Sequence, residues 1–303
     1  MKIKVPGLDR LSNAGGGSTF IKNLNKSKDY QLVSDGDYDL LLIAGATLTD
    51  RETVIQAEKD GKPIILRVDN ILEDSKNRNT GMPRLEEFAD RASVIVYQSE
   101  WAKRLLTPIC GEGMVIHNGV DTDIFYPAEK KPEKIRIVYS KHSRNEIKRF
   151  HEVQYFWREY NIDKRGDELV TIGRFAREYF SVNNPFEFHN EEKFKHEGVI
   201  DDVERLAGTL RLCNVAFLPY FADACSNTVL ECQACGLPVL YCEYGGTREI
   251  VRHGGAIDWS KTALQMVEDV KDKEFDFESF KIEFGLDVMN NKYYKLFELL
   301  IHE

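Results

Sequence analysis

The chain has 303 residues and a mass of 34.9 kDa, which allows two compact domains that each bury a core of their own. Its composition is that of an ordinary globular protein. A formal net charge of −9 argues against broad binding to nucleic acid, because such binding needs a basic surface. The N-terminus lacks the apolar core of a signal peptide, and no apolar run is long enough to cross a bilayer. We therefore expect a cytoplasmic protein without a transmembrane segment, with peripheral association with a membrane as the alternative.

Short apolar runs alternate with helical stretches along the chain. Such runs predict strands that are buried on both faces of parallel sheets, and hence an α/β protein. The predicted strands are residues 3–5, 40–44, 64–68, 94–97 and 114–117, followed by 135–139, 169–172, 215–218 and 238–241. Residues 118–134 are rich in turn-forming and charged residues, which predicts a linker between a first domain at 1–127 and a second at 128–284. A final amphipathic helix is predicted near residues 285–303.

Three consecutive glycines follow the first predicted strand. Gly16 and Gly17 would let backbone amides approach a phosphate or a sugar closely, with Ser18 or Thr19 as the cap of the next helix. The sequence contains no Walker loop, because no Gly-Lys-Ser or Gly-Lys-Thr occurs. The alternative is a flexible turn that binds nothing.

Arg67 and Asp69 end the third predicted strand of the first domain. They should therefore lie at the carboxyl edge of the sheet, where open α/β folds bind their ligands. We predict that both contact the acceptor side of a ligand site, and the alternative is an ion pair that closes the strand. Ser99 follows the next predicted strand and is a candidate helix cap.

A basic cluster follows the first strand of the second domain. Lys141, Ser143, Arg144 and Lys148 offer positive charge and hydrogen-bond donors that suit an anion. The alternative is a solvated, basic start of a helix.

A polar loop precedes the helix that is predicted to begin near Val203. The loop contains Val199 and Ile200, and Asp201 or Asp202 can cap the helix that follows.

An acid, a helix start and a second acid follow one another after the strand at 215–218. Asp223 comes first, and the polar cluster of Ser226, Asn227 and Thr228 then opens a helix that contains Glu231. The exposed amides of a helix N-terminus favour an anion such as a diphosphate, and a carboxylate one turn farther in accepts hydrogen bonds from sugar hydroxyls. The alternative for Glu231 is a capping box, in which Thr228 and Glu231 only satisfy the amides of their own helix.

Cys232 and Cys235 form a C-x-x-C pair on one face of this predicted helix. A zinc site needs further ligands, and the flanking Cys225 and Cys242 lie at opposite ends of the helix. We therefore expect no metal here and interpret the cysteines as reduced, buried apolar side chains.

These motifs resemble family 4 glycosyltransferases, which are retaining enzymes with the GT-B fold. Asp223 and Glu231 are eight positions apart, as the acid-x7-acid motif of that family requires. Residues 234–239 and 245–249 follow at the spacing of the family, and residues 117–127 resemble its hinge. The resemblance implies two Rossmann-like parallel-sheet domains that face each other across a cleft, with the final helix packed back on the first domain.

The resemblance also implies a reaction and its residues. A sugar would move from a nucleoside-diphosphate sugar to an acceptor hydroxyl with retention of configuration and without a metal or other cofactor. Lys148, with Lys141 or Arg144, would hold the diphosphate, Glu231 would hold the ribose and Asp223 would contact the donor sugar. The amides near Ser226, Asn227 and Thr228, the glycine loop and the backbone at residues 199–200 would complete the donor site.

Two alternative functions remain open, and so do the base of the donor and the chemical class of the acceptor. The first acid is Asp223 where the family usually has Glu, and the usual arginine directly after the strand is missing; both departures fit a degenerate protein that binds sugar nucleotides without catalysis. Residues 35–37 and 121–123 both read D-x-D, which fits a metal-dependent transferase instead. The donor base (uracil, guanine or adenine) and the acceptor (glycan, lipid-linked or small molecule) do not follow from the sequence.

Overall fold

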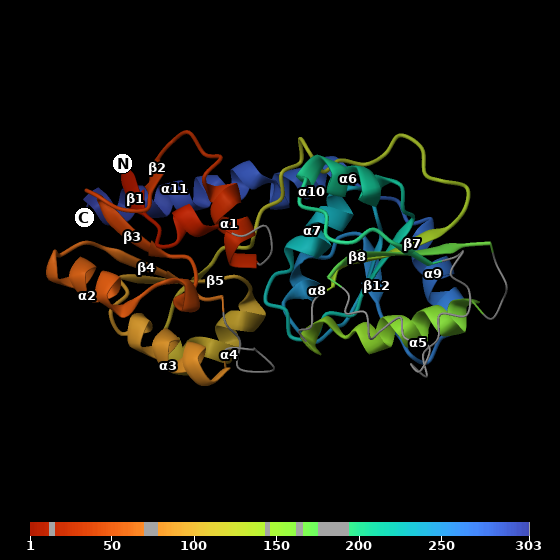
Figure 1. Ribbon diagram of the computed structural model, residues 1–303, viewed down its shortest axis with the longest axis horizontal. Helices are drawn as coiled ribbons and strands as arrows, with labels where there is room; N and C mark the ends of the chain where they lie inside the picture. The colour runs from red at the N-terminus through yellow and green to blue at the C-terminus, as the bar shows by residue number, and fades with distance from the viewer. Residues whose placement is uncertain (12–15, 70–77, 143–145, 162–165, 175–193, 303) are drawn as a thin grey trace. The chain divides into compact units, whose positions relative to one another are not determined.

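The computed structural model describes residues 1–11, 16–69, 78–142, 146–161, 166–174 and 194–302. The chain forms two compact units (Figure 1). Unit 1 consists of Met1–Asp121, Ala224–Asn227 and Ile282–Glu303, and unit 2 consists of Thr122–Asp223 and Thr228–Lys281. Both units are therefore assembled from segments that are separate in the sequence.

Unit 1 contains a six-stranded parallel sheet with the strand order β2-β1-β3-β4-β5-β6. Its strands are β1 Lys2–Lys4, β2 Gln31–Val33, β3 Leu40–Ile43, β4 Ile64–Arg67, β5 Val94–Tyr97 and β6 Met114–Val115. The central strands β3 and β4 are buried at every position, because helices cover both faces.

The helices of unit 1 form two layers, one on each face of the sheet (Figure 1). Its helices are α1 Gly16–Leu24, α2 Arg51–Lys59, α3 Arg78–Ala89, α4 Glu100–Cys110 and α11 Leu286–His302, with short 3-10 turns at η1 Leu8–Arg10 and η2 Ala46–Leu48. Apolar side chains of α1 and α11 pack on one face, whereas those of α2, α3 and α4 pack on the other. The last helix of the chain is thus part of the core that its first helix helps to form.

Unit 2 also contains a six-stranded parallel sheet, with the strand order β12-β11-β10-β7-β8-β9. Its strands are β7 Arg136–His142, β8 Glu168–Gly173, β9 Phe194–His196, β10 Val215–Leu218, β11 Val239–Tyr241 and β12 Gly254–Ala256. Its helices are η3 Glu146–Lys148, α5 Phe150–Asn161, α6 Val203–Arg211, α7 Asn227–Ala234, α8 Thr247–Ile250 and α9 Ala263–Lys271, and α10 Phe277–Phe284 leads into unit 1. The central strand β10 places its carboxyl end beside that of β7, which is where polar side chains of the two following loops can meet.

The α/β class with two parallel sheets, predicted from the apolar runs, is confirmed. Ser99 caps α4 as predicted, since its Oγ accepts from the Ala102 amide at 3.1 Å, and Asp202 caps α6 in the same way. The predicted cap of the first helix is wrong. Helix α1 already begins at Gly16, so that Ser18 and Thr19 lie within its first turn. None of the helices in the described part of the chain is both long and apolar enough to span a membrane.

Candidate functional site

A lysine and an aspartate meet at the carboxyl edge of the sheet of unit 2. Lys148 ends η3, the short turn after β7, and Asp223 follows β10. The Lys148 Nζ lies 3.3 Å from Asp223 Oδ2, and both side chains are mostly buried, at 17% and 18% exposure. Two hydrogen bonds fix the turn: the Tyr139 hydroxyl donates to the Lys148 carbonyl at 2.9 Å, and the Phe221 amide donates to the Ile147 carbonyl at 2.8 Å. The two charged side chains therefore come from backbone segments that are hydrogen-bonded to one another.

The ring of Tyr220 lies against the ammonium group of Lys148. The Lys148 Nζ lies 3.6 Å from the centroid of this ring, which is a cation–π contact. Burial raises the pKa of Tyr220 far above its ordinary value, so the hydroxyl stays protonated and donates to the Ser140 carbonyl. The sequence reasoning missed Tyr220. The available signal was its position two residues after a buried strand that ends at the ligand-binding edge.

The backbone at Asp223 is held by a glycine turn. Asp223 forms an isolated parallel bridge with Gly245, and the Gly246 amide donates to the Asp223 carbonyl at 2.8 Å. Gly245 has φ of 138°, and a Cβ on it would lie 2.9 Å from the Asp223 carbonyl oxygen. The preceding residue, Ala222, has a left-handed φ of 54°, which costs about 1 kcal/mol in a residue with a side chain. The orientation of Asp223 is therefore maintained against local strain.

Helix α7 begins at Asn227, four residues after Asp223. Glu231 lies one turn inside the helix with 6% of its surface exposed, and Ser226 and Thr228 are buried as well. Thr228 lies inside the helix, one residue after its start, whereas the capping-box interpretation required it to be the N-cap.

The remaining donor-side predictions are spread over both units. The backbone of Lys141 belongs to the last part of β7, but its side chain, Ser143 and Arg144 lie outside the described residues. Val199 and Ile200 lie in the loop between β9 and α6, with Val199 exposed. In unit 1 the predicted glycines Gly16 and Gly17 form the start of α1. A Cβ on Gly16 would meet open space, whereas a Cβ on Gly17 would lie 2.9 Å from Leu48 Cδ1.

Arg67 is almost completely buried, with 2% of its surface exposed, at the carboxyl end of β4. Its guanidinium donates to the Ala44 carbonyl at 3.0 Å, to Gln98 Oε1 at 2.6 Å and to Asn118 Oδ1 at 3.0 Å. It also lies 4.1 Å from the centroid of the Phe20 ring. From the end of β4, the Arg67 side chain therefore connects the loops that follow β3, β5 and β6 within unit 1, and these contacts replace the ion pair that was the alternative for Arg67 and Asp69.

Asp69 lies directly beyond this strand and faces a glycine. Its Oδ1 accepts from the Ala46 amide at 3.3 Å, and a Cβ on Gly45 would lie 2.4 Å from its Oδ2. Burial raises the pKa of the Asp69 carboxyl, an effect that the nearby Arg67 charge opposes.

The cysteines are free thiols. Cys232 is buried in α7 and Cys235 is buried directly after its end. Burial raises the pKa of the Cys235 thiol to about 12, so that this sulfur carries a proton at neutral pH. Cys225 belongs to the segment of unit 1 that precedes α7, where Asn118 Nδ2 donates to its carbonyl at 2.8 Å. The first D-x-D sequence is exposed, with Asp35 paired to Lys4 at 3.6 Å.

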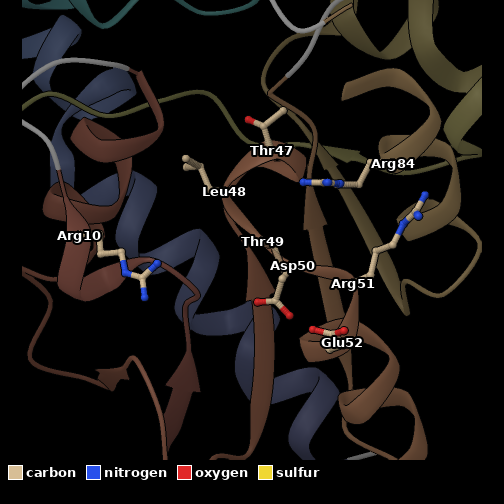
Figure 2. A pocket seen from close by; sticks show the side chains of 8 residues that line it. All are labelled: Arg10, Thr47, Leu48, Thr49, Asp50, Arg51, Glu52 and Arg84. Carbon is tan, nitrogen blue, oxygen red and sulfur yellow. The ribbon is translucent and has the colours of Figure 1, made fainter. Parts of the chain in front are cut away.

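A pocket of about 380 Å³ lies in unit 1 (Figure 2). It is formed by the turn η2, the start of α2 and two arginines from η1 and α3. The lining residues are Arg10, Thr47, Leu48, Thr49, Asp50, Arg51, Glu52 and Arg84. Sequence reasoning did not identify this pocket, because its arginines come from segments that are about 40 and 30 residues apart and have no shared motif.

Comparison with known proteins gives a family match within unit 2 and a fold match over the whole chain. Residues 147–274 match the family model of group 1 glycosyl transferases. This segment contains Lys148, Asp223 and Glu231. No curated protein matches the chain in sequence.

Solved structures of several glycosyltransferases have the same fold. Anabaena HepE in complex with UDP and glucose is 13% identical, with 98% of this chain and 99% of that chain covered and a TM-score of 0.70. Sucrose-phosphate synthase from Thermosynechococcus elongatus is 14% identical, with coverage of 99% and 98% and a TM-score of 0.69. The pneumococcal O-GlcNAc transferase GtfA in complex with UDP and GlcNAc is 12% identical, with coverage of 94% and 60% and a TM-score of 0.64. The fold is therefore GT-B, and the family match supports a glycosyltransferase.

Proposed function

We propose that this protein is a retaining, metal-independent glycosyltransferase that moves a hexose from a UDP-sugar to an acceptor hydroxyl. The resemblance to family 4 supports retention of configuration. The fold relatives HepE and GtfA were solved with UDP, and HepE also with UDP-glucose, which favours uracil over guanine or adenine as the donor base. The observation that carries the proposal is the Lys148–Asp223 pair, which lies beside the glycine turn and four residues before α7.

The lysine and the helix start would stabilise the departing diphosphate. In the reaction, the bond between the anomeric carbon and the β-phosphate oxygen breaks, and negative charge develops on the diphosphate. Lys148 is held in place by Asp223 and Tyr220, so its positive charge needs little rearrangement when the leaving group forms. The first amides of α7 have no partner within the helix and add the positive end of the helix dipole.

The acceptor would need no separate general base. Its hydroxyl oxygen attacks the anomeric carbon on the face that the diphosphate leaves, and its proton passes to the departing phosphate oxygen. The products are a glycoside with the original configuration and the nucleoside diphosphate. Because Lys148 and the helix amides supply the positive charge, activity should persist in EDTA, whereas a metal-dependent D-x-D enzyme would lose it.

Glu231 and Asp223 would position the donor. A carboxylate accepts two hydrogen bonds side by side, which suits Glu231 for the two hydroxyls of a ribose. Asp223 would contact a hydroxyl of the transferred sugar through the oxygen that faces away from Lys148. Each role uses a carboxylate whose backbone is fixed within unit 2.

Substitution of Glu231 tests the proposal. Glu231→Gln keeps the shape of the buried side chain but offers only one acceptor oxygen, and Glu231→Ala removes both. We expect the affinity for UDP and the rate of UDP-sugar turnover to fall by about 10²-fold or more in Glu231→Ala, with a smaller loss in Glu231→Gln. Glu204→Ala, at an exposed site on α6, is the matched control. Normal turnover in a folded Glu231→Ala variant would refute the donor site.

A sugar-nucleotide-binding protein without catalysis is the second candidate. The observation in its favour is that Asp223, in place of the usual Glu of the family, already pairs with Lys148. Such a protein would bind UDP-sugars but would neither transfer nor hydrolyse them. Slow hydrolysis of UDP-glucose without an acceptor, lost in Glu231→Ala, would exclude this candidate.

A further inference from the structure

We infer that the pocket of unit 1 is the acceptor site and that the acceptor carries a phosphate or carboxylate group beside its hydroxyls. This inference rests on the proposed transferase function and goes beyond it by naming a class of acceptor. The pocket has its own residues, and none of them belongs to the donor site proposed in unit 2.

The pocket lies at the carboxyl edge of its sheet, where α/β folds bind ligands. Its turn η2 directly follows β3, and η1, which carries Arg10, follows β1. The same turn contacts Asp69 through the Ala46 amide, and a Cβ on Gly17 would lie 2.9 Å from Leu48 Cδ1. The turn that lines the pocket therefore also neighbours the start of α1 and the carboxyl group that was predicted to lie on the acceptor side.

The arginines of the pocket differ in how far their charge is already neutralised. Arg51 is paired with Glu87 at 2.7 Å. Among the described residues, Arg10 forms an ion pair with its neighbour Asp9 alone, at 3.8 Å, with 86% of its side chain exposed. Arg84 forms no ion pair with any residue of the described ranges. Two guanidinium groups are thus available to a ligand, and Figure 2 shows them on either side of the loop that carries Thr47 and Leu48.

Two acidic side chains, Asp50 and Glu52, line the pocket beside its three arginines. Asp50 is engaged as the cap of α2, where it accepts from the Thr53 amide at 2.8 Å and from the Thr53 hydroxyl at 2.9 Å. Glu52 and Thr47 offer oxygen atoms that accept hydrogen bonds from sugar hydroxyls, and Leu48 exposes 45% of its surface as a small apolar wall. Two bidentate cation groups, hydroxyl acceptors and one apolar contact suit a sugar or polyol with an anionic group better than a neutral one.

Binding of defined probes tests the inference. Calorimetric titrations would compare glucose 6-phosphate with glucose in the wild type, in Arg10→Gln, in Arg84→Gln and in the double variant. Arg104→Gln removes an exposed arginine of unit 1 that does not line the pocket and is the charge-matched control. We expect the wild type and Arg104→Gln to prefer the phosphate-bearing sugar, and each pocket variant to bind it about tenfold more weakly. Vesicles of phosphatidylglycerol in phosphatidylcholine, as a second probe, distinguish a lipid headgroup from a soluble acceptor.

The outcomes separate this inference from the proposed function. Titration with UDP reports on the donor site, and its affinity should stay the same in the pocket variants and fall in Glu231→Ala. Absence of a preference for anionic probes in the wild type, or equal binding in the double variant, would overturn the inference while UDP binding keeps the transferase proposal intact. A parallel loss of UDP binding in the pocket variants would overturn it too, because the arginines would then belong to the donor site. A wild type that does not bind UDP refutes the proposed function instead.

Discussion

The ammonium group of Lys148 is held between a carboxylate and an aromatic ring. Asp223 fixes it from one side at 3.3 Å, and the Tyr220 ring lies 3.6 Å away. Both contacts restrict the rotamers of the lysine, which a long, flexible side chain otherwise explores. A fixed charge of this kind is what electrostatic stabilisation of a leaving group requires.

Removal of this charge should slow turnover much more than it weakens the fold. We expect Lys148→Ala to lower kcat for UDP-sugar turnover by about 10²- to 10³-fold, because the leaving diphosphate loses its cation. Steady-state kinetics, with circular dichroism for the fold, measures this. Lys130→Ala, at an exposed site, should behave as the wild type. A Lys148→Ala variant with kcat within threefold of the wild type would contradict the assigned role.

His253 makes the stability of the protein depend on pH, and it does not belong to the candidate donor site. Its side chain is 3% exposed and stacks on Phe275, and burial, with the charges of Lys131 and Lys273, lowers its pKa to about 4. The native state therefore keeps the ring neutral, whereas the unfolded chain takes up a proton below pH 6.5. The resulting stabilisation is complete above about pH 6.5 and is lost as the pH falls towards about 4.

The loss of stability at pH 5 should be measurable by urea unfolding. We expect the wild type to lose about 2 kcal/mol of unfolding free energy between pH 7 and pH 5 through His253 alone. His253→Phe keeps an aromatic ring against Phe275 and should lack this part of the pH dependence. Equal pH dependence in the two proteins would show that His253 is protonated in the native state.

At the level of elements, the turn at Gly245 links β11 to the loop that carries Asp223. The residue has φ of 138°, and a side chain there would press on the Asp223 backbone. The substitution Gly245→Ala should therefore shift the carboxylate as well as strain the turn.

We expect Gly245→Ala to lower kcat and to cost more stability than the roughly 1 kcal/mol of a positive φ alone. Gly36→Ala is the matched control, because Gly36 has φ of 88° and open space around it. Urea unfolding and kinetics of both variants measure the two effects. If Gly245→Ala behaves like Gly36→Ala, the bridge does not position Asp223.

The sequence predicted the inner strands well and missed edge strands. Every predicted apolar run contains a strand, but β2, β9 and β12 lie at the edges of the two sheets and were not foreseen. An edge strand is paired on one side only and is less buried, so it needs no continuous apolar run. The strand β12 consists of Gly254, Gly255 and Ala256, which carry almost no side-chain signal.

Site residues could be predicted from the sequence where a single segment contains a recognisable spacing or follows a predicted strand. Glu231 and Asp223 follow from their spacing, and Lys148 from its place after a strand. The pocket arginines were not predictable, because they come together only through contacts between segments that are distant in the sequence. For Tyr220 the available signal was its position two residues after β10, but its contact with Lys148 also joins distant segments. Packing of this kind leaves no local pattern.

At the scale of the whole molecule, unit 1 depends on the last helix of the chain. Met289, Tyr293, Leu296 and Phe297 of α11 are buried in the same core cluster as Phe20 of α1. The Phe297 ring lies 5.1 Å from that of Tyr30 in an edge contact. The C-terminal residues thus contribute to a core whose strands all come from the first part of the sequence.

Truncation of one side chain on this helix should destabilise unit 1 selectively. We expect Phe297→Ala to cost about 3–5 kcal/mol, as for a fully buried ring, whereas Leu299→Ala, 56% exposed on the same helix, should cost less than about 0.5 kcal/mol. Hydrogen exchange should show the loss of protection in β1, β3 and β4. Equal loss in the strands of unit 2 would mean that the two units unfold as one.

The division of the chain into two units also affects the order in which the units can fold during synthesis. Unit 2 ends at Lys281, whereas unit 1 needs residues up to the final helix. The sheet that is translated first can therefore complete its core only after the last helix has left the ribosome exit tunnel, when the strands of unit 2 are already available to pair. Nascent unit 1 strands would meanwhile expose apolar surface, which makes early release of the N-terminal half a hazard for aggregation and a reason for chaperone binding.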